Sequence, residues 1–314
     1  MDKLWLIGAG SIAKEYAKVL NALGKEFIVV GRGKKNADLF YDEIGVHPVV
    51  GGLENYLRNN SPETPNMAIV AVNVQYLAET TIALMRYGVK KILCEKPGFN
   101  DPSELDEVFA VANSTRSQVY YAYNRRFFAS VFKAEEIIKE DGGLTSMNFE
   151  FTEWGHIIED LDTPDIVKRH WLTANSSHVI DLAFFLGGKP QEISSYTAGK
   201  LTWHKPSRFV GAGVTKKGIL FNYQANWEAP GRWALEFQTP FHRIYLKPME
   251  LLQLQDKGSV KVYPVEIDDR LDKEFKPGFY LETKAFLEGE TTRLCSIEEQ
   301  VNNTKEIFQK IQKT

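Results

Sequence analysis

The stretch Leu4-Trp5-Leu6-Ile7-Gly8-Ala9-Gly10-Ser11-Ile12-Ala13 decides the fold of this 314-residue chain. Its apolar start predicts a short buried strand, and residues 12–23 then repeat apolar side chains at helical spacing. In such a strand–turn–helix, the first glycine permits a tight turn, the second lets the backbone approach a pyrophosphate, and the helix N-terminus attracts phosphate charge. The stretch therefore predicts a dinucleotide site. Its candidate residues are Gly8, Gly10, Ser11 and Ile12.

Alternating strand and helix patterns continue through the first third of the chain. Further buried strands are predicted at 27–30, 67–72, 91–94 and 119–123. After Asn124 the pattern changes to successive strand-like runs joined by short turns, which indicates a largely antiparallel sheet. We therefore predict an α/β protein with two domains. Residues 1–122 form a doubly wound parallel Rossmann sheet, and residues 123–314 form an α/β domain with an open, mostly antiparallel sheet.

Composition narrows the classes of function. The net charge of −3 gives no general attraction to a nucleic-acid polyanion, and no apolar run approaches the roughly 20 residues that span a bilayer. The chain shows no secretion-signal pattern, and its only cysteines, Cys94 and Cys295, suit a reducing compartment. We therefore expect a cytoplasmic protein with no nucleic-acid or membrane partner.

The end of the second predicted strand bears on the choice of cofactor. NAD sites usually have an Asp or Glu about 20 residues after the glycines, which accepts a hydrogen bond from the ribose 2′-hydroxyl. This chain has Gly31-Arg32-Gly33 instead, and a guanidinium pairs with a 2′-phosphate that a carboxylate would repel. The sequence therefore predicts NADP(H), held at Gly31 and Arg32. NAD(H) stays open, because a solvated basic loop has the same composition.

A second motif follows the strand predicted at 91–94. Lys96, within Glu95-Lys96-Pro97, stands at the carboxyl end of that strand, which is the edge where ligands lie in doubly wound folds. Beside a nicotinamide, a desolvated lysine can exchange a proton with a substrate hydroxyl. The motif alone also fits a surface turn.

The motifs occur in the order of a known family. The Gly-x-Gly-x-x-Ala start, Glu95-Lys96-Pro97, Asn124-Arg125-Arg126-Phe127 and His178-x-x-Asp181 together resemble the Gfo/Idh/MocA oxidoreductases, from residue 4 to the closing helix. The resemblance implies a Rossmann domain followed by an open-sheet α/β domain. It also implies hydride transfer between a nicotinamide and a carbon atom of a sugar-like substrate.

The resemblance implies a role for each matched residue. Lys96 is the expected proton donor or acceptor, and His178 is its acid/base or orienting partner from the second domain. Glu95 and Pro97 are expected to shape the nicotinamide pocket. Asp181, one helical turn after the histidine, is expected to position that helix.

Two positions depart from the family pattern. Many members carry an Asp four residues before the histidine, where this chain has Ala174, so Lys96 must act with His178 alone or with Asn175. The Thr-Pro-Asn usual after the third strand reads Val72-Asn73-Val74. Asn73 is still expected to hydrogen-bond the nicotinamide ribose.

The segment before the His178 helix suggests the class of substrate. It combines aromatic rings, which stack on sugars, with basic side chains, which hold a carboxylate or phosphate. We expect a sugar acid or a nucleotide sugar, although core packing and solvation would explain these residues equally well. Arg126 equally fits hydrogen bonding between the domains. The predicted substrate contacts are Lys96, Arg126, Trp154, Arg169, Asn175 and His178.

Other interpretations stay open. A lyase or glycosidase of this fold would oxidise a sugar transiently and return the hydride, whereas a dinucleotide-binding sensor would not turn over. Ala174 favours the sensor, and the pair Lys96 and His178 favours an enzyme. No histidine spacing suggests a metal site. An open apolar sheet face is unfavourable in water, so a homodimer or homotetramer is expected.

Overall fold

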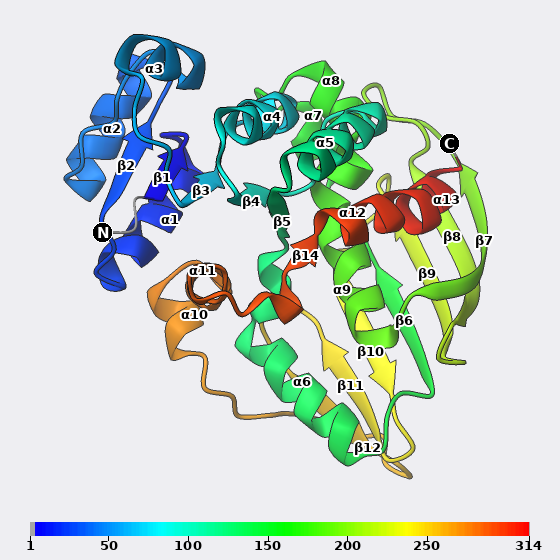
Figure 1. Cartoon of the computed structure of the whole chain (residues 1–314). Coiled ribbons are helices and arrows are strands. Elements are labelled where there is room, and N and C mark those ends of the chain that lie inside the picture. Colours follow the sequence, from blue (N-terminus) through cyan, green and yellow to red (C-terminus); the bar gives the residue numbers. More distant parts are fainter. Residues whose placement is uncertain (1–3, 314) are drawn as a thin grey trace. The chain divides into compact units, whose positions relative to one another are not determined.

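The computed structural model describes residues 4–313 (Figure 1). The chain divides into two compact units. Unit 1 comprises the residues up to Asn124 and Glu274–Val301, and unit 2 comprises Arg125–Lys273 and the residues from Asn302 onward. The predicted division placed residues 123–314 together in the second domain. In the structure, residues 274–301 return to unit 1. The returning strand β14 (Cys295–Ser296) is only two residues long, too short to produce a periodic pattern.

A six-stranded sheet forms the centre of unit 1. Its strand order is β2-β1-β3-β4-β5-β14, in which the first five strands are parallel and β14 is antiparallel. All four residues of β1 are buried, as expected for a strand covered on both faces. The predicted doubly wound parallel sheet is confirmed. The parallel strands are β1 (Leu4–Ile7), β2 (Phe27–Val30), β3 (Met67–Val70), β4 (Lys91–Glu95) and β5 (Gln118–Ala122).

The helices of unit 1 pack in two groups, in which α1 contacts α2 and α11 while α4 contacts α5. Helix α5 begins on a capping box formed by Asp101 and Glu104. The sequence did not predict α2, in which only two of the eleven residues, Ala37 and Phe40, are buried. The helices are α1 (Ser11–Ala22), α2 (Lys34–Ile44), α3 (Leu53–Asn60), α4 (Leu77–Tyr87), α5 (Pro102–Thr115) and α11 (Phe279–Glu288), with 3-10 turns η1 (Val74–Tyr76) and η4 (Thr291–Arg293).

Unit 2 is built on an eight-stranded sheet in which all neighbours are antiparallel except β6 and β9. This confirms the expected mostly antiparallel sheet. In spatial order the strands are β7 (Pro190–Ala198), β8 (Arg208–Thr215), β9 (Leu220–Asn226), β6 (Ser146–Glu150), β10 (Ala234–Gln238), β11 (His242–Leu246), β12 (Gln253–Asp256) and β13 (Val262–Pro264).

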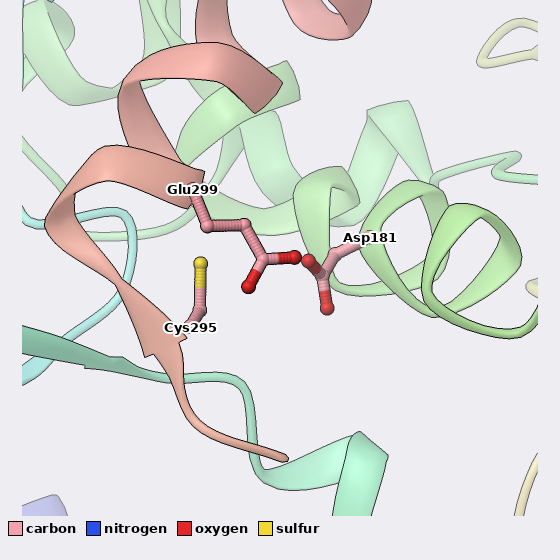
Figure 2. Close-up of side chains that lie close together, drawn as sticks. All are labelled: Asp181, Cys295 and Glu299. Atoms are coloured by element: carbon pink, nitrogen blue, oxygen red, sulfur yellow. The ribbon is translucent and has the colours of Figure 1, made fainter. Parts of the chain in front are cut away.

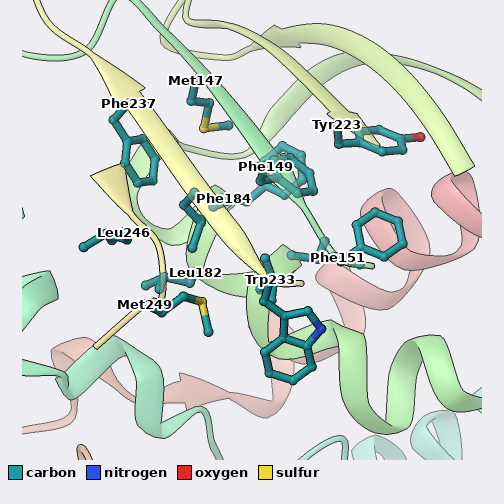
Figure 3. Packing of buried hydrophobic residues seen from close by; sticks show 14 of the residues in the cluster. Met147, Phe149, Phe151, Leu182, Phe184, Tyr223, Trp233, Phe237, Leu246 and Met249 are labelled. Atoms are coloured by element: carbon teal, nitrogen blue, oxygen red, sulfur yellow. The ribbon is translucent and has the colours of Figure 1, made fainter. Parts of the chain in front are cut away.

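Helices cover one face of this sheet, where α9 packs on β6 and β10 and α13 packs on β7 and β8. Figure 3 shows the core beneath α9, in which Phe149 meets Phe184 edge to face at 5.7 Å and stacks on Tyr223 at 5.3 Å. The helices are α6 (Ala129–Glu140), α7 (Gly155–Glu159), α8 (Asp165–Arg169), α9 (Ser177–Gly187), α10 (Arg270–Glu274), α12 (Ile297–Asn303) and α13 (Gln309–Gln312), with 3-10 turn η2 (Asn124–Phe127) and π-helical turns η3 (Leu172–Ser176) and η5 (Thr304–Phe308). Both α10 and α12 extend across a unit boundary.

The other face of the sheet is mostly polar. Its central positions on β6, β9 and β10 include Asn148, Glu150, Asn222, Gln224 and Glu236, all of which are partly or fully exposed. Exposed apolar side chains on this face include Tyr196, Val210, Leu220 and Val262. The expectation of a broad apolar face is therefore wrong, and the oligomer inferred from it loses that physical basis. The homodimer or homotetramer stays a prediction.

None of the helices within residues 4–313 combines the length and the hydropathy needed to cross a membrane.

Candidate functional site

A cavity of about 490 Å³ lies in unit 1, at the carboxyl ends of β1, β2 and β3. Its size is within the range of small-molecule sites. Four predicted cofactor residues line it: Gly8, Gly10, Arg32 and Asn73. The other candidates of this group, Ser11, Ile12 and Gly31, adjoin these residues in the chain.

Backbone geometry explains the two glycines of the first turn. Gly8 has φ +127°, and a Cβ atom there would lie 2.2 Å from the Ala71 carbonyl oxygen, so no larger residue fits. At Gly10, by contrast, an added Cβ atom would meet no described atom within 4 Å. Because α1 begins after Gly10 without a side-chain cap, its first N–H groups are available to a phosphate.

Two further helices begin at the same cavity. Helix α2 follows Gly33 and α3 follows Gly52, neither has a side-chain cap, and both glycines line the cavity. The two loops are bonded together, since the Gly52 N–H donates to the Gly31 carbonyl at 2.9 Å. Three glycine-capped helix N-termini therefore open on one cavity, which favours a ligand with several phosphate groups.

Arg32 faces this cavity together with a residue that the sequence did not single out. Its guanidinium carbon lies 4.3 Å from the centre of the Tyr76 ring, in the 3-10 turn after β3. A hydrogen bond from Arg32 lowers the pKa of the Tyr76 hydroxyl. Two carboxylates, Glu54 and Glu79, also line the cavity. Tyr76 lies outside every motif, so no pattern in the sequence marks it.

The Glu95-Lys96-Pro97 turn is held by neighbours within unit 1. Strand β4 ends at Glu95, whose carboxylate accepts a hydrogen bond from the Tyr16 hydroxyl of α1 at 2.8 Å. The Pro97 carbonyl accepts from Gln300 Nε2 of α12 at 2.8 Å. Lys96 is thus fixed between two bonded residues, at the sheet edge predicted from the sequence.

Burial sets the protonation of the pair beside this turn. Burial raises the pKa of the Glu95 carboxyl group. The hydrogen bond from Tyr16 and the positive charge of Lys96 lower this pKa and partly offset the effect of burial. Burial and the charge of Glu95 raise the pKa of Tyr16 well above its usual range. Tyr16 therefore remains the donor, and it links the helix at the dinucleotide turn to the Lys96 turn.

The C-terminal return of unit 1 supports the same turn. Figure 2 labels Cys295 on β14 and Glu299 on α12, both from this return. Cys295 pairs with Tyr121 across the sheet edge, and its Sγ lies 3.6 Å from Oε1 of Gln300, the residue that holds Pro97. The return therefore contributes to the cofactor-binding unit, although it lies about 200 residues from Lys96 in the chain.

In unit 2, the π-helical turn η3 leads into α9, which carries His178 in its first turn. His178 is buried, and its ring centre lies 6.1 Å from that of Trp233. Asp181, labelled on α9 in Figure 2, follows one turn later. It accepts from Nε and Nη2 of Arg126 at 2.8 and 2.5 Å, and Asn303 donates to it at 3.3 Å.

These contacts concern the roles that the sequence suggested for Asp181 and Arg126. Asp181 anchors its helix, as the resemblance implied, through a bidentate pair in which both side chains are buried. Arg126 forms this pair inside unit 2, so the geometry favours a structural role for it over contact with substrate. Arg169 lies exposed at the end of α8.

A buried carboxylate contacts the residues that precede His178. Glu153, which follows β6, accepts from Ser176 Oγ at 2.7 Å and from Asn175 Nδ2 at 3.0 Å, and Arg232 Nη1 lies 3.2 Å from its second oxygen. Burial raises the pKa of Glu153, and these donors lower it again in part. Ala174 is buried in the same turn. Glu153 thus supplies a carboxylate to the segment that lacks one at position 174.

Two tryptophans complete this cluster. Trp154 is half exposed, and its Nε1 donates to the Gly231 carbonyl at 3.0 Å. The Arg232 guanidinium lies 4.8 Å from the Trp154 ring centre and 4.6 Å from that of Trp233. Trp154 and Asn175, both predicted substrate contacts, therefore meet at Glu153 and Arg232, which the sequence did not indicate. Glu153 and Arg232 are 79 residues apart and belong to no motif.

Comparisons with known proteins agree with this architecture. Residues 3–123 match the family model GFO_IDH_MocA, described as "Oxidoreductase family, NAD-binding Rossmann fold". No curated protein matches the chain in sequence.

Three solved structures illustrate the likeness in fold. UDP-N-acetylglucosamine 3-dehydrogenase GnnA from Acidithiobacillus ferrooxidans has a TM-score of 0.73 at 14% identity, covering 98% of this chain and 96% of its own. Levoglucosan dehydrogenase in complex with NADH has a TM-score of 0.77 at 15% identity, covering 98% and 95%. A putative NADPH-dependent oxidoreductase from Desulfitobacterium hafniense has a TM-score of 0.76 at 16% identity, covering 96% and 92%.

At such low identity the solved structures establish the fold, whereas the family match rests on the Rossmann unit. The cavity, the glycine turn and the position of Lys96 all lie within that unit. The Rossmann unit of this chain, at residues 3–123, therefore matches the model of the Gfo/Idh/MocA oxidoreductase family.

Proposed function

We propose that the protein is an NADP(H)-preferring oxidoreductase that transfers a hydride between nicotinamide and a hydroxyl-bearing or carbonyl carbon of a sugar-like substrate. The observation that carries the proposal is the cavity of unit 1, where Gly8 and Gly10 shape a phosphate-binding turn and Arg32 stands at the end of β2. When bound there, nicotinamide supplies or takes the hydride. The chain's own residues bind it, position the substrate and move the proton.

The preference for NADP(H) rests on charge. A 2′-phosphate carries up to two negative charges, and Arg32 can pair with it in a bidentate way. The N-termini of α2 and α3, on the loops beside Arg32, add partial positive charge. Glu54, in the first turn of α3, is the group that would instead favour the 2′-hydroxyl of NAD(H).

The proton chemistry is assigned to Lys96 and His178. Lys96 moves the hydroxyl proton of the substrate, and its position is supported by the bonds of Glu95 and Pro97 to α1 and α12. His178 assists from α9, whose orientation is supported by the Asp181–Arg126 pair. Both assignments follow the general requirement that an acid/base group be held rigidly at the reacting atoms.

A sugar-like substrate is supported by the aromatic cluster and by the related folds. Trp154 offers a half-exposed ring near the start of α9, and such rings stack on the apolar faces of sugars. Among the similar structures are a UDP-N-acetylglucosamine dehydrogenase and a levoglucosan dehydrogenase. The assay that tests the proposal follows NADPH absorbance with keto and aldehydo sugars, and NADP⁺ reduction with their alcohols.

Wild-type turnover that is lost in Lys96→Met and His178→Ala, with cofactor binding intact, is the expected result. Turnover retained in both variants would refute the assigned roles. NADPH binding without turnover on any substrate would favour a dinucleotide sensor. The observation that favours this second function is Ala174, a buried methyl group at the position where the family resemblance implies a carboxylate.

A further inference from the structure

We propose that Arg232 is the anion-recognition residue of unit 2, and that the substrate carries a carboxylate or phosphate group which this guanidinium binds. The inference rests on the proposed function, because it specifies the substrate of that reaction. The Arg232 side chain makes three contacts within unit 2.

The Arg232 guanidinium lies against two indole rings. Its guanidinium carbon is 4.8 Å from the Trp154 ring centre and 4.6 Å from that of Trp233. A guanidinium stacked on aromatic faces keeps its N–H donors pointing outward in the plane of the group. The third contact, Nη1 to Glu153 at 3.2 Å, sets the rotation of that plane.

The residues that contact Arg232 are themselves held by hydrogen bonding or burial. Trp154 is anchored by its hydrogen bond to the Gly231 carbonyl. A Cβ atom at Gly231 would lie 2.4 Å from Glu150 Oε1 and 2.8 Å from the Thr152 methyl group, so the chain passes closely over β6 at this point. Trp233 is buried at the edge of the core shown in Figure 3. The arginine is therefore preorganised, and binding an anion requires little further ordering.

Burial within the ion pair is unequal. The Glu153 side chain is 1% exposed, whereas that of Arg232 is 47% exposed. Ser176, Asn175 and Arg232 all donate to the carboxylate, while the guanidinium has five N–H donors of which Glu153 engages one. The buried Glu153 carboxylate thus holds the Arg232 guanidinium in place. The exposed N–H groups of Arg232 can bind a ligand. An ordinary surface pair would expose both partners.

The location connects this anion site to the proposed chemistry. The centre of the Trp233 ring lies 4.6 Å from the Arg232 guanidinium carbon. The same ring centre lies 6.1 Å from that of His178. A second guanidinium, that of Arg125, lies 4.8 Å from the same indole. Glu153 in turn bonds to Asn175 and Ser176, which immediately precede α9. An anion held by Arg232 would therefore orient a sugar beside the proposed acid/base residue.

The test compares charged and neutral sugars on the whole protein saturated with NADP⁺. Isothermal titration calorimetry with D-glucuronate, D-glucose 6-phosphate and D-glucose separates carboxylate, phosphate and neutral ligands. We expect at least one anionic sugar to bind about tenfold more tightly than D-glucose, as one charge-assisted bond would give. Arg232→Gln should remove that preference, and Arg232→Lys, which keeps the charge without the fork, should weaken it.

A matched control is available in the same unit. Arg208 pairs with Glu228 at 3.7 Å, and both of these side chains are exposed, so Arg208→Gln removes the same charge from an ordinary surface pair. This variant should keep the wild-type preference for the anionic sugar. NADPH affinity and the unfolding temperature of each variant confirm that it is folded.

Three results would overturn the inference. The first is that wild type binds all three sugars with equal affinity, or binds none of them. The second is a preference for the anionic sugar that survives in Arg232→Gln, and the third is a preference that is lost in Arg169→Gln instead. The proposed function fails separately. NADPH turnover without any Arg232-dependent preference contradicts only the inference, whereas an Arg232-dependent preference without turnover on any sugar contradicts only the oxidoreductase assignment.

Discussion

The cofactor cavity of unit 1 and the Glu153–Arg232 cluster of unit 2 are built in different ways. The cavity is made largely of backbone, with three glycine-capped helix N-termini and a glycine that tolerates no side chain. The cluster is made of side chains from loops far apart in the chain. Backbone sites bind what is common to all dinucleotides, and side-chain sites select an individual substrate. The following predictions separate these two kinds of recognition.

The largest effect is expected at Lys96. Replacing it by methionine keeps most of the side-chain volume and removes the group that moves the proton. Turnover should fall by about 10²–10⁴-fold, the usual contribution of an acid/base group. NADPH affinity should change little, because the cavity is formed by other residues. Steady-state kinetics and a fluorescence titration of NADPH measure the two quantities, and a parallel loss of both would contradict the assignment.

The two glycines of the first turn should respond differently to a side chain. A Cβ atom at Gly8 would clash with the Ala71 carbonyl, so Gly8→Ala should lower the free energy of unfolding by about 2 kcal/mol or more. Gly10→Val should cost less, about 1 kcal/mol, because an added Cβ atom there meets no described atom within 4 Å and the remaining cost is that of valine at a helix N-cap.

Gly10→Val should nevertheless weaken NADPH binding by about 100-fold, or about 2.8 kcal/mol, because its side chain occupies the space beside the helix N-terminus. Thermal and urea unfolding and NADPH titration distinguish the two variants. Normal NADPH binding by folded Gly10→Val would show that the pyrophosphate lies elsewhere.

Replacing Arg32 tests how much its side chain adds to the dinucleotide affinity that the backbone of the cavity provides. Arg32→Gln should weaken NADPH binding by about tenfold, the equivalent of one charge-assisted contact, and should leave NADH binding nearly unchanged. Glu54→Gln, in the first turn of α3, is the matched variant. A loss of NADH binding in Glu54→Gln, with no effect of Arg32→Gln on NADPH, would assign the ribose to Glu54 and reverse the cofactor preference.

The smallest effect concerns the pH dependence of stability at Glu153. Burial raises its pKa in the folded protein above the ordinary value of 4.5. The folded state therefore binds the proton more tightly than the unfolded state, and the stability contributed by Glu153 falls as pH rises from 4.5 through the raised pKa.

Relative to Glu153→Gln, wild type should lose up to about 1.4 kcal/mol per pH unit in that window. Urea unfolding of both proteins across the window measures the difference. A wild type that gains stability relative to the variant as pH rises would contradict the raised pKa.

The same contrast explains what could be predicted from the sequence. Strands β1 and β2 and the turn at Gly8 have local patterns, so their places were predicted from adjacent residues alone. Lys96 was recognisable because its motif follows a buried strand. Glu153, Arg232 and Tyr76 have no such pattern, because each acquires its role from a residue distant in the chain. Residues 274–301 return to unit 1 and include a strand of only two residues. Such a short strand produces no periodic pattern in the sequence.

Hydride transfer itself gives the most direct test of the central claim. The wild-type protein is incubated with NADPH that carries two deuterium atoms at nicotinamide C4, so that transfer from either face is labelled, together with a mixture of neutral and anionic keto sugars. The products are examined by mass spectrometry. We expect deuterium on a carbon of a reduced sugar, with equivalent formation of NADP⁺, and no transfer in Lys96→Met. Deuterium retained entirely on the cofactor, with the sugars either unchanged or cleaved, would contradict it.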